Sequence, residues 1–226
     1  MANVMTDTHE ILTKPREIVF QRKAEHVVEN LRKRNISAIY CRTCKEAVGE
    51  IRKLIPNGAT VALGGSVSVL QSGLLEVLRA MNITLLDRYR LGITNEEVEE
   101  VLRRGVGADV LVMSSNAVTA DGKLVNEDGR GNRVSGLIFG PKKVILMIGV
   151  NKIVPTVEDG IARIKNIAAP LNCIRLGADT PCAKTGFCDD ENCHAPARVC
   201  SQIVITESSR AKDRITVVLV GEELGY

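Results

Sequence analysis

A pair of glycines and a pair of serines follow a short apolar run near residue 60. The run, residues 60–63, predicts a buried strand, and Gly64, Gly65, Ser66 and Ser68 stand between it and a predicted helix. Glycine lets a backbone approach a ligand closely, and the free N–H groups at a helix start favour an anion. A tight turn with a serine cap would use the same residues. We expect these four residues to line an anion site.

A polar segment, residues 115–133, follows the predicted strand 110–114 and contains amides, carboxylates and three glycines. A plain hairpin turning at Asp121-Gly122 would use the same composition. Polar side chains this dense at a strand end also orient ligands. The expected catalytic residues are Asp121, Asn126 and Asn132, and the expected ligand-binding residues are Asn116 and Asp128.

Four cysteines, Cys182, Cys188, Cys193 and Cys200, fall within nineteen residues, with His194 beside one of them. Four thiolates can hold zinc or an iron–sulfur cluster. The intervening five, four and six residues lack the Cys-x-x-Cys pairs typical of structural zinc. Two interpretations of this stretch therefore remain open. The four cysteines are metal ligands, or they are thiols that are free, buried or redox-active.

A separate Cys-x-x-Cys pair, Cys41 and Cys44, lies between a predicted strand and a predicted helix. That position suits a redox motif, because a helix start lowers a thiol pKa. Two small packing residues are the simpler interpretation, and Cys173 is expected in the core.

The bulk composition excludes several classes of protein. The 226 residues are 45% hydrophobic and 25% charged, with a net charge of only +3 and no Trp. These values predict a globular protein that does not bind nucleic acid. No apolar run approaches the roughly 20 residues that span a bilayer, and the first residues lack a signal-peptide pattern. We expect a cytoplasmic protein, in which thiols stay reduced.

Strands and helices alternate along the chain. A helix is expected after Pro15, another at 68–81 with a Ser68…Gln71 capping box, one from Thr94…Glu97 to about residue 105, and one from Thr156 to about 167. The expected strands are 36–40, 60–63, 83–86, 110–114, 143–150, 202–206 and 215–220. Such crossovers predict a mostly parallel sheet in an α/β, Rossmann-like three-layer sandwich, with 177–201 as an inserted loop.

Three stretches together carry a family resemblance. They are GGSVSVLQSGLLEVL (64–78), NAVTADGKLVNEDGRGNRVSGLIFGPKKVILMIGVNKIV (116–154) and LVGEELGY (219–226). In their order they resemble the LUD (lactate utilisation) domain family, which includes lactate-utilisation protein C. The resemblance covers about residues 14–226 and implies a single LUD domain, with a fold similar to the ribose-phosphate isomerase and CoA-transferase superfamily.

The resemblance also implies roles for particular residues. Relatives hold phosphate, CoA or folate groups at the glycine-rich strand end and at the Asn/Asp-rich loop. By that likeness Gly64, Gly65 and Ser66 would line the anion site, Asp121, Asn126 and Asn132 would face the ligand, and Glu222 would close the pocket.

Three functions follow as hypotheses. As the family name implies, the chain would be a subunit or accessory of lactate oxidation to pyruvate, beside iron–sulfur protein subunits. Alternatively it would be an independent enzyme for a phosphorylated, CoA-linked or folate-like metabolite. A metal- or redox-sensing module governed by the cysteines is the third, and a homodimer is the default assembly.

Overall fold

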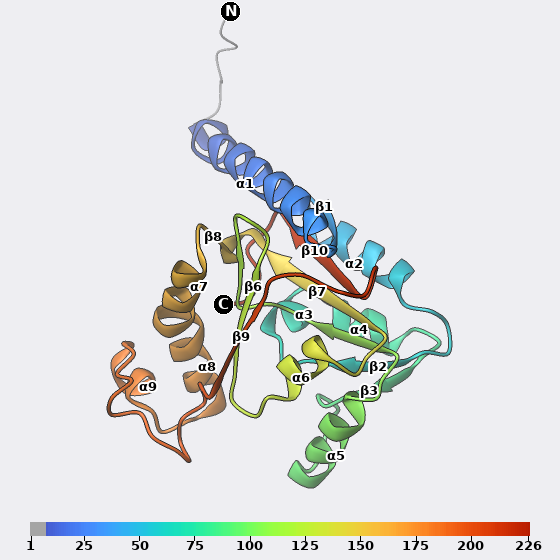
Figure 1. The fold of residues 1–226 in the computed structure, drawn as a ribbon, viewed down its shortest axis with the longest axis vertical. Coiled ribbons are helices and arrows are strands. Elements are labelled where there is room, and N and C mark those ends of the chain that lie inside the picture. The colour runs from blue at the N-terminus through green and yellow to red at the C-terminus, as the bar shows by residue number, and fades with distance from the viewer. Residues whose placement is uncertain (1–7) are drawn as a thin grey trace, which may run out of the picture.

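The computed structural model describes residues 8–226, and a parallel six-stranded sheet forms their centre (Figure 1). Every neighbouring pair of its strands is parallel, in the order β1-β10-β7-β4-β2-β3. The strands are β1 (Ser37–Cys41), β2 (Thr60–Leu63), β3 (Thr84–Leu86), β4 (Val110–Met113), β7 (Lys143–Gly149) and β10 (Ile215–Val220). This sheet, with layers on both faces, confirms the predicted Rossmann-like α/β class.

Both faces of the central sheet are buried. Along β7, Val144, Leu146 and Ile148 enter one hydrophobic core, whereas Ile145 and Met147 enter the other. Strand side chains alternate between the two faces of a sheet, so a strand covered on both sides is apolar throughout. The first core lies under α1 (Thr8–Lys33), α5 (Asn95–Gly105) and α6 (Asn132–Ile138), and the second under α2 (Cys44–Leu54), α3 (Val67–Gln71) and α4 (Leu74–Arg79).

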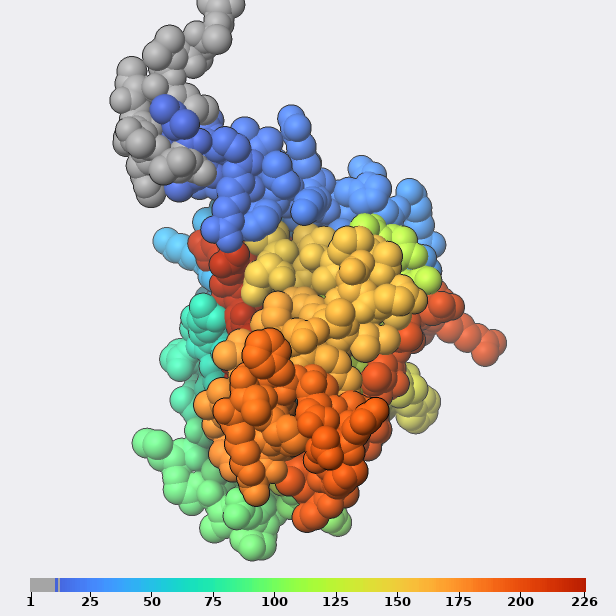
Figure 2. All heavy atoms as spheres, turned by 90° about the vertical axis from the view of Figure 1, so that its left-hand side faces the viewer, coloured from blue at the N-terminus to red at the C-terminus, as the bar shows by residue number. Residues whose placement is uncertain are grey.

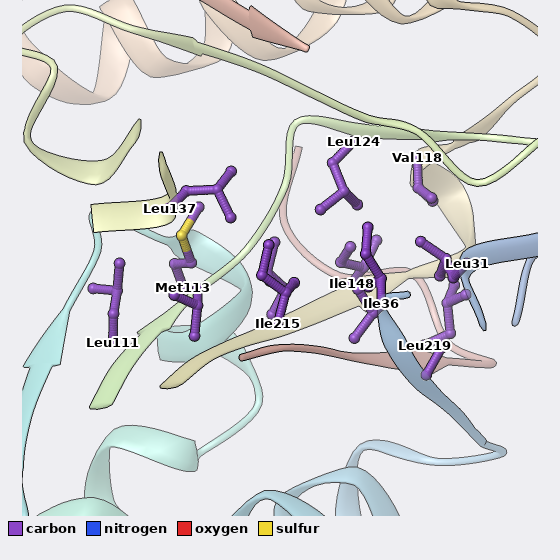
Figure 3. Packing of buried hydrophobic residues seen from close by; sticks show 14 of the residues in the cluster. Leu31, Ile36, Leu111, Met113, Val118, Leu124, Leu137, Ile148, Ile215 and Leu219 are labelled. Atoms are coloured by element: carbon purple, nitrogen blue, oxygen red, sulfur yellow. The ribbon is translucent and has the colours of Figure 1, made fainter. Parts of the chain in front are cut away.

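A second, four-stranded sheet was not predicted. Its order is β8-β5-β6-β9, and its strands are β5 (Ala117–Thr119), β6 (Leu124–Asp128), β8 (Ile153–Val154) and β9 (Gln202–Thr206). Residues 202–206 therefore do not extend the parallel sheet, because β9 pairs antiparallel with β6. Val118 of β5 and Leu124 of β6 join the core above the central sheet, together with Leu31 and Ile148 (Figure 3).

The outer face of the second sheet is covered by a chain of helices. After the 3-10 turn η1 (Val150–Lys152) come α7 (Val157–Arg163), the π-helical turn η2 (Ile164–Ala168), α8 (Ala169–Leu176) and α9 (Pro181–Thr185). Figure 2 looks onto this layer, where α7 to α9 (orange) lie between α1 (blue) above and α5 (green) below. The helix expected to end near residue 167 thus continues through η2 into α8.

Several predicted helix boundaries were wrong. The first helix begins at Thr8 and includes Pro15 rather than starting after it. The predicted helix 68–81 is two helices, because Gly73 adopts a positive φ of 74° between them. Ser66 caps the first of these by accepting a hydrogen bond from the Val69 N–H at 3.3 Å, so Ser68 is not the cap. The Thr94…Glu97 capping box is confirmed.

No helix among residues 8–226 combines the length and apolar character needed to cross a membrane.

The hairpin that was the alternative interpretation of Asp121-Gly122 is present, and it packs against α1. Gly122 has a φ of 86°, and its N–H donates to Thr119 O at 2.9 Å. A Cβ on Gly122 would lie 2.7 Å from the backbone of Asn30 and Leu31. Asn30 and Arg34 also donate to this turn, at Ala120 O and Asp121 Oδ2.

We expect Gly122→Ala to lower the free energy of unfolding by about 3 kcal/mol, because it combines a left-handed backbone penalty with overpacking. Gly58→Ala is the matched control, since Gly58 also has a positive φ of 75° but open space around it. That control should cost about 1 kcal/mol. Urea unfolding of both variants measures the difference, and equal losses would show that α1 does not press on the turn.

Candidate functional site

The carboxyl ends of five parallel strands meet around one cleft. Its volume is about 730 Å³, within the range of small-molecule sites. The strand-end residues that line it are Gly65 and Ser66 after β2, Arg88 after β3, Ser114, Ser115 and Asn116 after β4, Lys152 after β7, and Tyr226 after β10. Residues 127–133, α8 and residues 196–200 contribute to the other walls. Ligands of open parallel sheets bind at this end of the strands.

Lys152 is the most unusual residue of the cleft, because its side chain is only 3% exposed. Its Nζ donates to Ser68 Oγ at 2.8 Å and to Ser114 Oγ at 3.2 Å. Burial, followed by the positive charges of Arg163 and Arg133, lowers the pKa of Lys152 to about 7. A neutral amine beside two hydroxyl groups can accept a proton near neutral pH.

The polar loop is organised around the buried Arg133. Its guanidinium donates to the side-chain oxygens of Asn126 at 2.6 Å and Asn116 at 2.8 Å. It also donates to the backbone carbonyls of Ser114 at 3.1 Å and Glu127 at 2.8 Å. Arg133 therefore fixes the loop after β4 to the strand β6. Its donors are occupied, so its role is to position the loop.

The expected site residues divide into three groups. Gly65, Ser66, Asn116, Asp128 and Asn132 line the cleft. The second group, Gly64, Ser68 and Asn126, lies beneath the cleft. A Cβ on Gly64 would meet Met113, and Ser68 contacts the cleft residue Lys152 by accepting its hydrogen bond. Asn126 is fully buried and accepts a hydrogen bond from Arg133.

Asp121 and Glu222 are not among the residues that line the cleft. Asp121 lies at the tip of the hairpin, where its carboxylate pairs with Arg34 at 2.7 Å and accepts from Thr119 Oγ1 at 2.5 Å. The Thr119 hydrogen bond, followed by the charges of Arg34 and Lys123, lowers the pKa of Asp121. Glu222 accepts from the backbone N–H of Cys44 at 2.9 Å. The roles given to these two carboxylates stay predictions.

The charge of the cleft is predominantly positive. The basic residues that line it are Arg88, Arg130, Arg133, Lys152, Arg175 and Arg198. Two carboxylates, Glu127 and Asp128, also line it. Glu127 accepts from Lys165 at 3.0 Å, and Asp128 accepts from two backbone N–H groups at the start of α6. The helix α3 begins at the cleft, after Ser66, but it has only five residues. The arginines therefore attract an anion more strongly than the dipole of α3 does.

Two buried polar atoms at the cleft have no partner among the described residues. They are Glu127 Oε2 and the Tyr226 hydroxyl, and both residues line the cleft. Buried polar atoms are nearly always hydrogen-bonded in folded proteins, to protein, water or ligand. Because both residues line the cleft, water or a ligand held there is a source of the missing partner.

All seven cysteines are free thiols. Cys41 and Cys44 lie at the β1–α2 junction, where burial first, and then nearby glutamates, raises their pKa to about 11 and about 12. Such thiols are protonated near neutral pH, unlike those of redox motifs. The other five, Cys173, Cys182, Cys188, Cys193 and Cys200, line a second, smaller cavity.

Lys152 and Arg133 were missed by sequence reasoning. The sequence does indicate Lys152, because it is a lone lysine three residues after the apolar strand 143–149, between Val150 and Ile153. Arg133 has no comparable signal, because its partners come from two segments elsewhere in the sequence, residues 114–116 and 126–127.

Comparison with known proteins identifies one family. The model of the LUD domain matches residues 24–220. A solved structure of a DUF162 family protein from Deinococcus radiodurans is similar at 16% identity, with a TM-score of 0.49 and coverage of 90% of this chain and 98% of that one. The structure of eIF2B beta from Chaetomium thermophilum is similar at 14% identity, with a TM-score of 0.37 over 51% of this chain and 44% of that one. No curated protein matches significantly.

Proposed function

Since this chain belongs to the LUD domain family, which is associated with lactate utilisation, we propose that its cleft binds an anionic metabolite of that metabolism and that Lys152 exchanges a proton with it. The observation that carries the proposal is the buried Lys152 amine, hydrogen-bonded to Ser68 and Ser114 where a basic cleft meets the sheet.

The size and charge of the cleft favour a ligand larger than lactate itself. A volume of about 730 Å³ suits a drug- or cofactor-sized molecule. Arg88 and Arg175 make no ion pair with a carboxylate of residues 8–226, so their charges remain available to a ligand. A phosphorylated or CoA-linked acid fits both features, because guanidinium groups bind phosphate and carboxylate in a bidentate manner.

The proton step follows from the same contacts. Ser114 lines the cleft and lies 3.2 Å from the Lys152 amine, so its hydroxyl group connects the buried base to a bound ligand. A hydroxyl paired with a neutral amine can act as a proton relay or as a nucleophile. Lys152 and Ser114 are thus the proposed proton-handling pair, and Asn116 and Asn132 are proposed to orient the ligand from the wall.

Calorimetric titration with coenzyme A, inorganic phosphate, pyruvate and lactate tests the proposal. We expect coenzyme A to bind most tightly, and Arg88→Ala and Arg175→Ala each to weaken binding by about tenfold, the loss of roughly one charge-assisted hydrogen bond. Lys142→Ala is the matched control, because Lys142 is exposed and precedes β7, at the opposite end of the strand from the cleft. No saturable binding, or equal weakening by all three variants, would refute the anion site.

A second candidate function is a role beside iron–sulfur subunits in lactate oxidation. The observation that favours it is the cavity lined by five cysteines, which shares Cys200 and Arg198 with the cleft. Co-expression with candidate iron–sulfur subunits, followed by size-exclusion chromatography, checks for a stable complex. Separate elution of the purified proteins at micromolar concentration would argue against this role.

A further inference from the structure

The second cavity gathers five thiols from one stretch of the chain, residues 173–200. Cys173 comes from α8, Cys182 from α9, Cys188 and Cys193 from the segment after α9, and Cys200 from just before β9. Thr180 caps α9 and lies 3.4 Å from the Cys182 sulfur. His194 is exposed and does not line the cavity, so thiols dominate its potential soft ligands.

Three of these thiols, those of Cys182, Cys193 and Cys200, lie near Cys173, whereas the thiol neighbours of Cys188 are Cys182 and Cys193. The Cys173 thiol lies within hydrogen-bonding reach of Cys182 and close to Cys193. Cys200 in turn lies close to Cys173 and Cys182. Cys173 therefore stands at the centre of the group, fixed by helix α8, although it had been expected to be an ordinary core residue.

Apart from the ion pair of Asp190 with Lys165 at 3.5 Å, few contacts tie residues 186–200 to the rest of the protein. Residues 186–200 contain neither helix nor strand, and none of them is buried. Ordering 15 such residues costs at least about 15 kcal/mol of backbone entropy. Arg198 offsets part of this cost through hydrogen bonds to Cys200 O, Cys193 O and Asp190. A structural zinc ion contributes about 10–16 kcal/mol, which is the scale required.

The room in the cavity indicates what kind of centre fits. It holds about 20 Å³, space for roughly one water-sized group. Among the described residues, no three His, Cys, Asp or Glu side chains stand close enough to hold a metal as they are oriented. A space of this size suits a single ion better than an iron–sulfur cluster, and binding an ion there requires the thiols to turn about χ1 into the cavity.

We propose that Cys173, Cys182, Cys193 and Cys200 bind one tetrahedral thiophilic ion, such as Zn²⁺, which ties residues 186–200 to α8. Cys188 is the spare thiol of the cavity. Because Ala169, Arg198, Val199 and Cys200 line both cavities, the ion would also fix one wall of the cleft. The proposal goes beyond the anion-binding function and rests on a different set of residues.

Metal analysis of protein purified without oxygen tests the site. The wild type and Cys188→Ser should each contain about one zinc per chain. Cys173→Ser should retain less than about a tenth of it, since three thiols remain around the ion. If Cys173→Ser kept its zinc and Cys188→Ser lost it, the ligand assignment would be wrong. If the protein contained iron and sulfide instead, the proposal of a single ion would be wrong.

A second measurement does not depend on the folding of a variant. Wild-type protein stripped with a chelator is titrated with Co²⁺, and cobalt–thiolate absorption should saturate at about one ion per chain. Circular dichroism before and after stripping checks that the α/β domain remains folded. Folded protein that takes up neither Co²⁺ nor Zn²⁺ stoichiometrically would refute the site, while coenzyme A binding would report separately on the cleft.

Discussion

Replacing Lys152 with methionine is expected to flatten the pH dependence of stability between about pH 7 and the usual lysine pKa of 10.5. In that window the unfolded wild-type chain carries a proton on Lys152 that the folded chain does not. The free energy of unfolding therefore rises with pH through the window, and the full cost of the buried amine is present below pH 7. At 1.36 kcal/mol for each pH unit, the total change is about 5 kcal/mol.

Urea unfolding of the wild type and the variant at intervals across this range measures the effect. Ionisations other than that of Lys152 contribute to both curves alike, so the difference between the two curves isolates Lys152. Lys142→Met is the control, because Lys142 is exposed in an ion pair with Asp109 and should leave the slope unchanged. Parallel curves for the wild type and Lys152→Met would mean that the folded protein keeps this amine charged.

Arg133→Met is expected to lower the free energy of unfolding by about 3–5 kcal/mol. The change leaves the side-chain oxygens of Asn116 and Asn126 and two backbone carbonyls without their donor inside the protein. Unsatisfied buried acceptors each cost about 1–3 kcal/mol. Arg133→Lys should recover only part of the loss, because an ammonium group cannot reproduce the planar fork.

Arg130→Met provides the matched control for this prediction. Arg130 lies three residues earlier, and its exposed side chain pairs with Glu99 at the surface. We expect its loss to change stability by less than about 0.5 kcal/mol. Chemical unfolding of the three variants gives the comparison, and similar losses for Arg130→Met and Arg133→Met would contradict a special role for the buried guanidinium.

The central sheet was predictable because its strands are buried on both faces. A strand such as β7 must be apolar at every position, so it stands out against the amphipathic helices around it. The second sheet was not predictable in the same way. Its strands β5 and β8 have three and two residues, too few for any alternation to be read.

The cleft was predictable in position but less so in detail. Parallel strands place their carboxyl ends together, and by this rule Ser66 and Asn116 were expected at the edge where they line the cleft, while their roles stay predictions. It could not place Asp121, because the hairpin β5–β6 carries that residue away to contact α1. Long-range packing also decides which charged groups are buried, so the sequence does not distinguish Arg133 from Arg130.

The strand order has a consequence for how the chain is synthesised. β10, near the end of the chain, lies between β1 and β7 and supplies the parallel partner of β1. When β1, α2 and β7 have already emerged from the ribosome, the sheet therefore has a gap between its edge strand β1 and the strand β7. Until residues 215–220 emerge, the facing edges of β1 and β7 stay open to pairing with other nascent chains. Slow or stalled translation before residues 215–220 emerge should therefore favour aggregation.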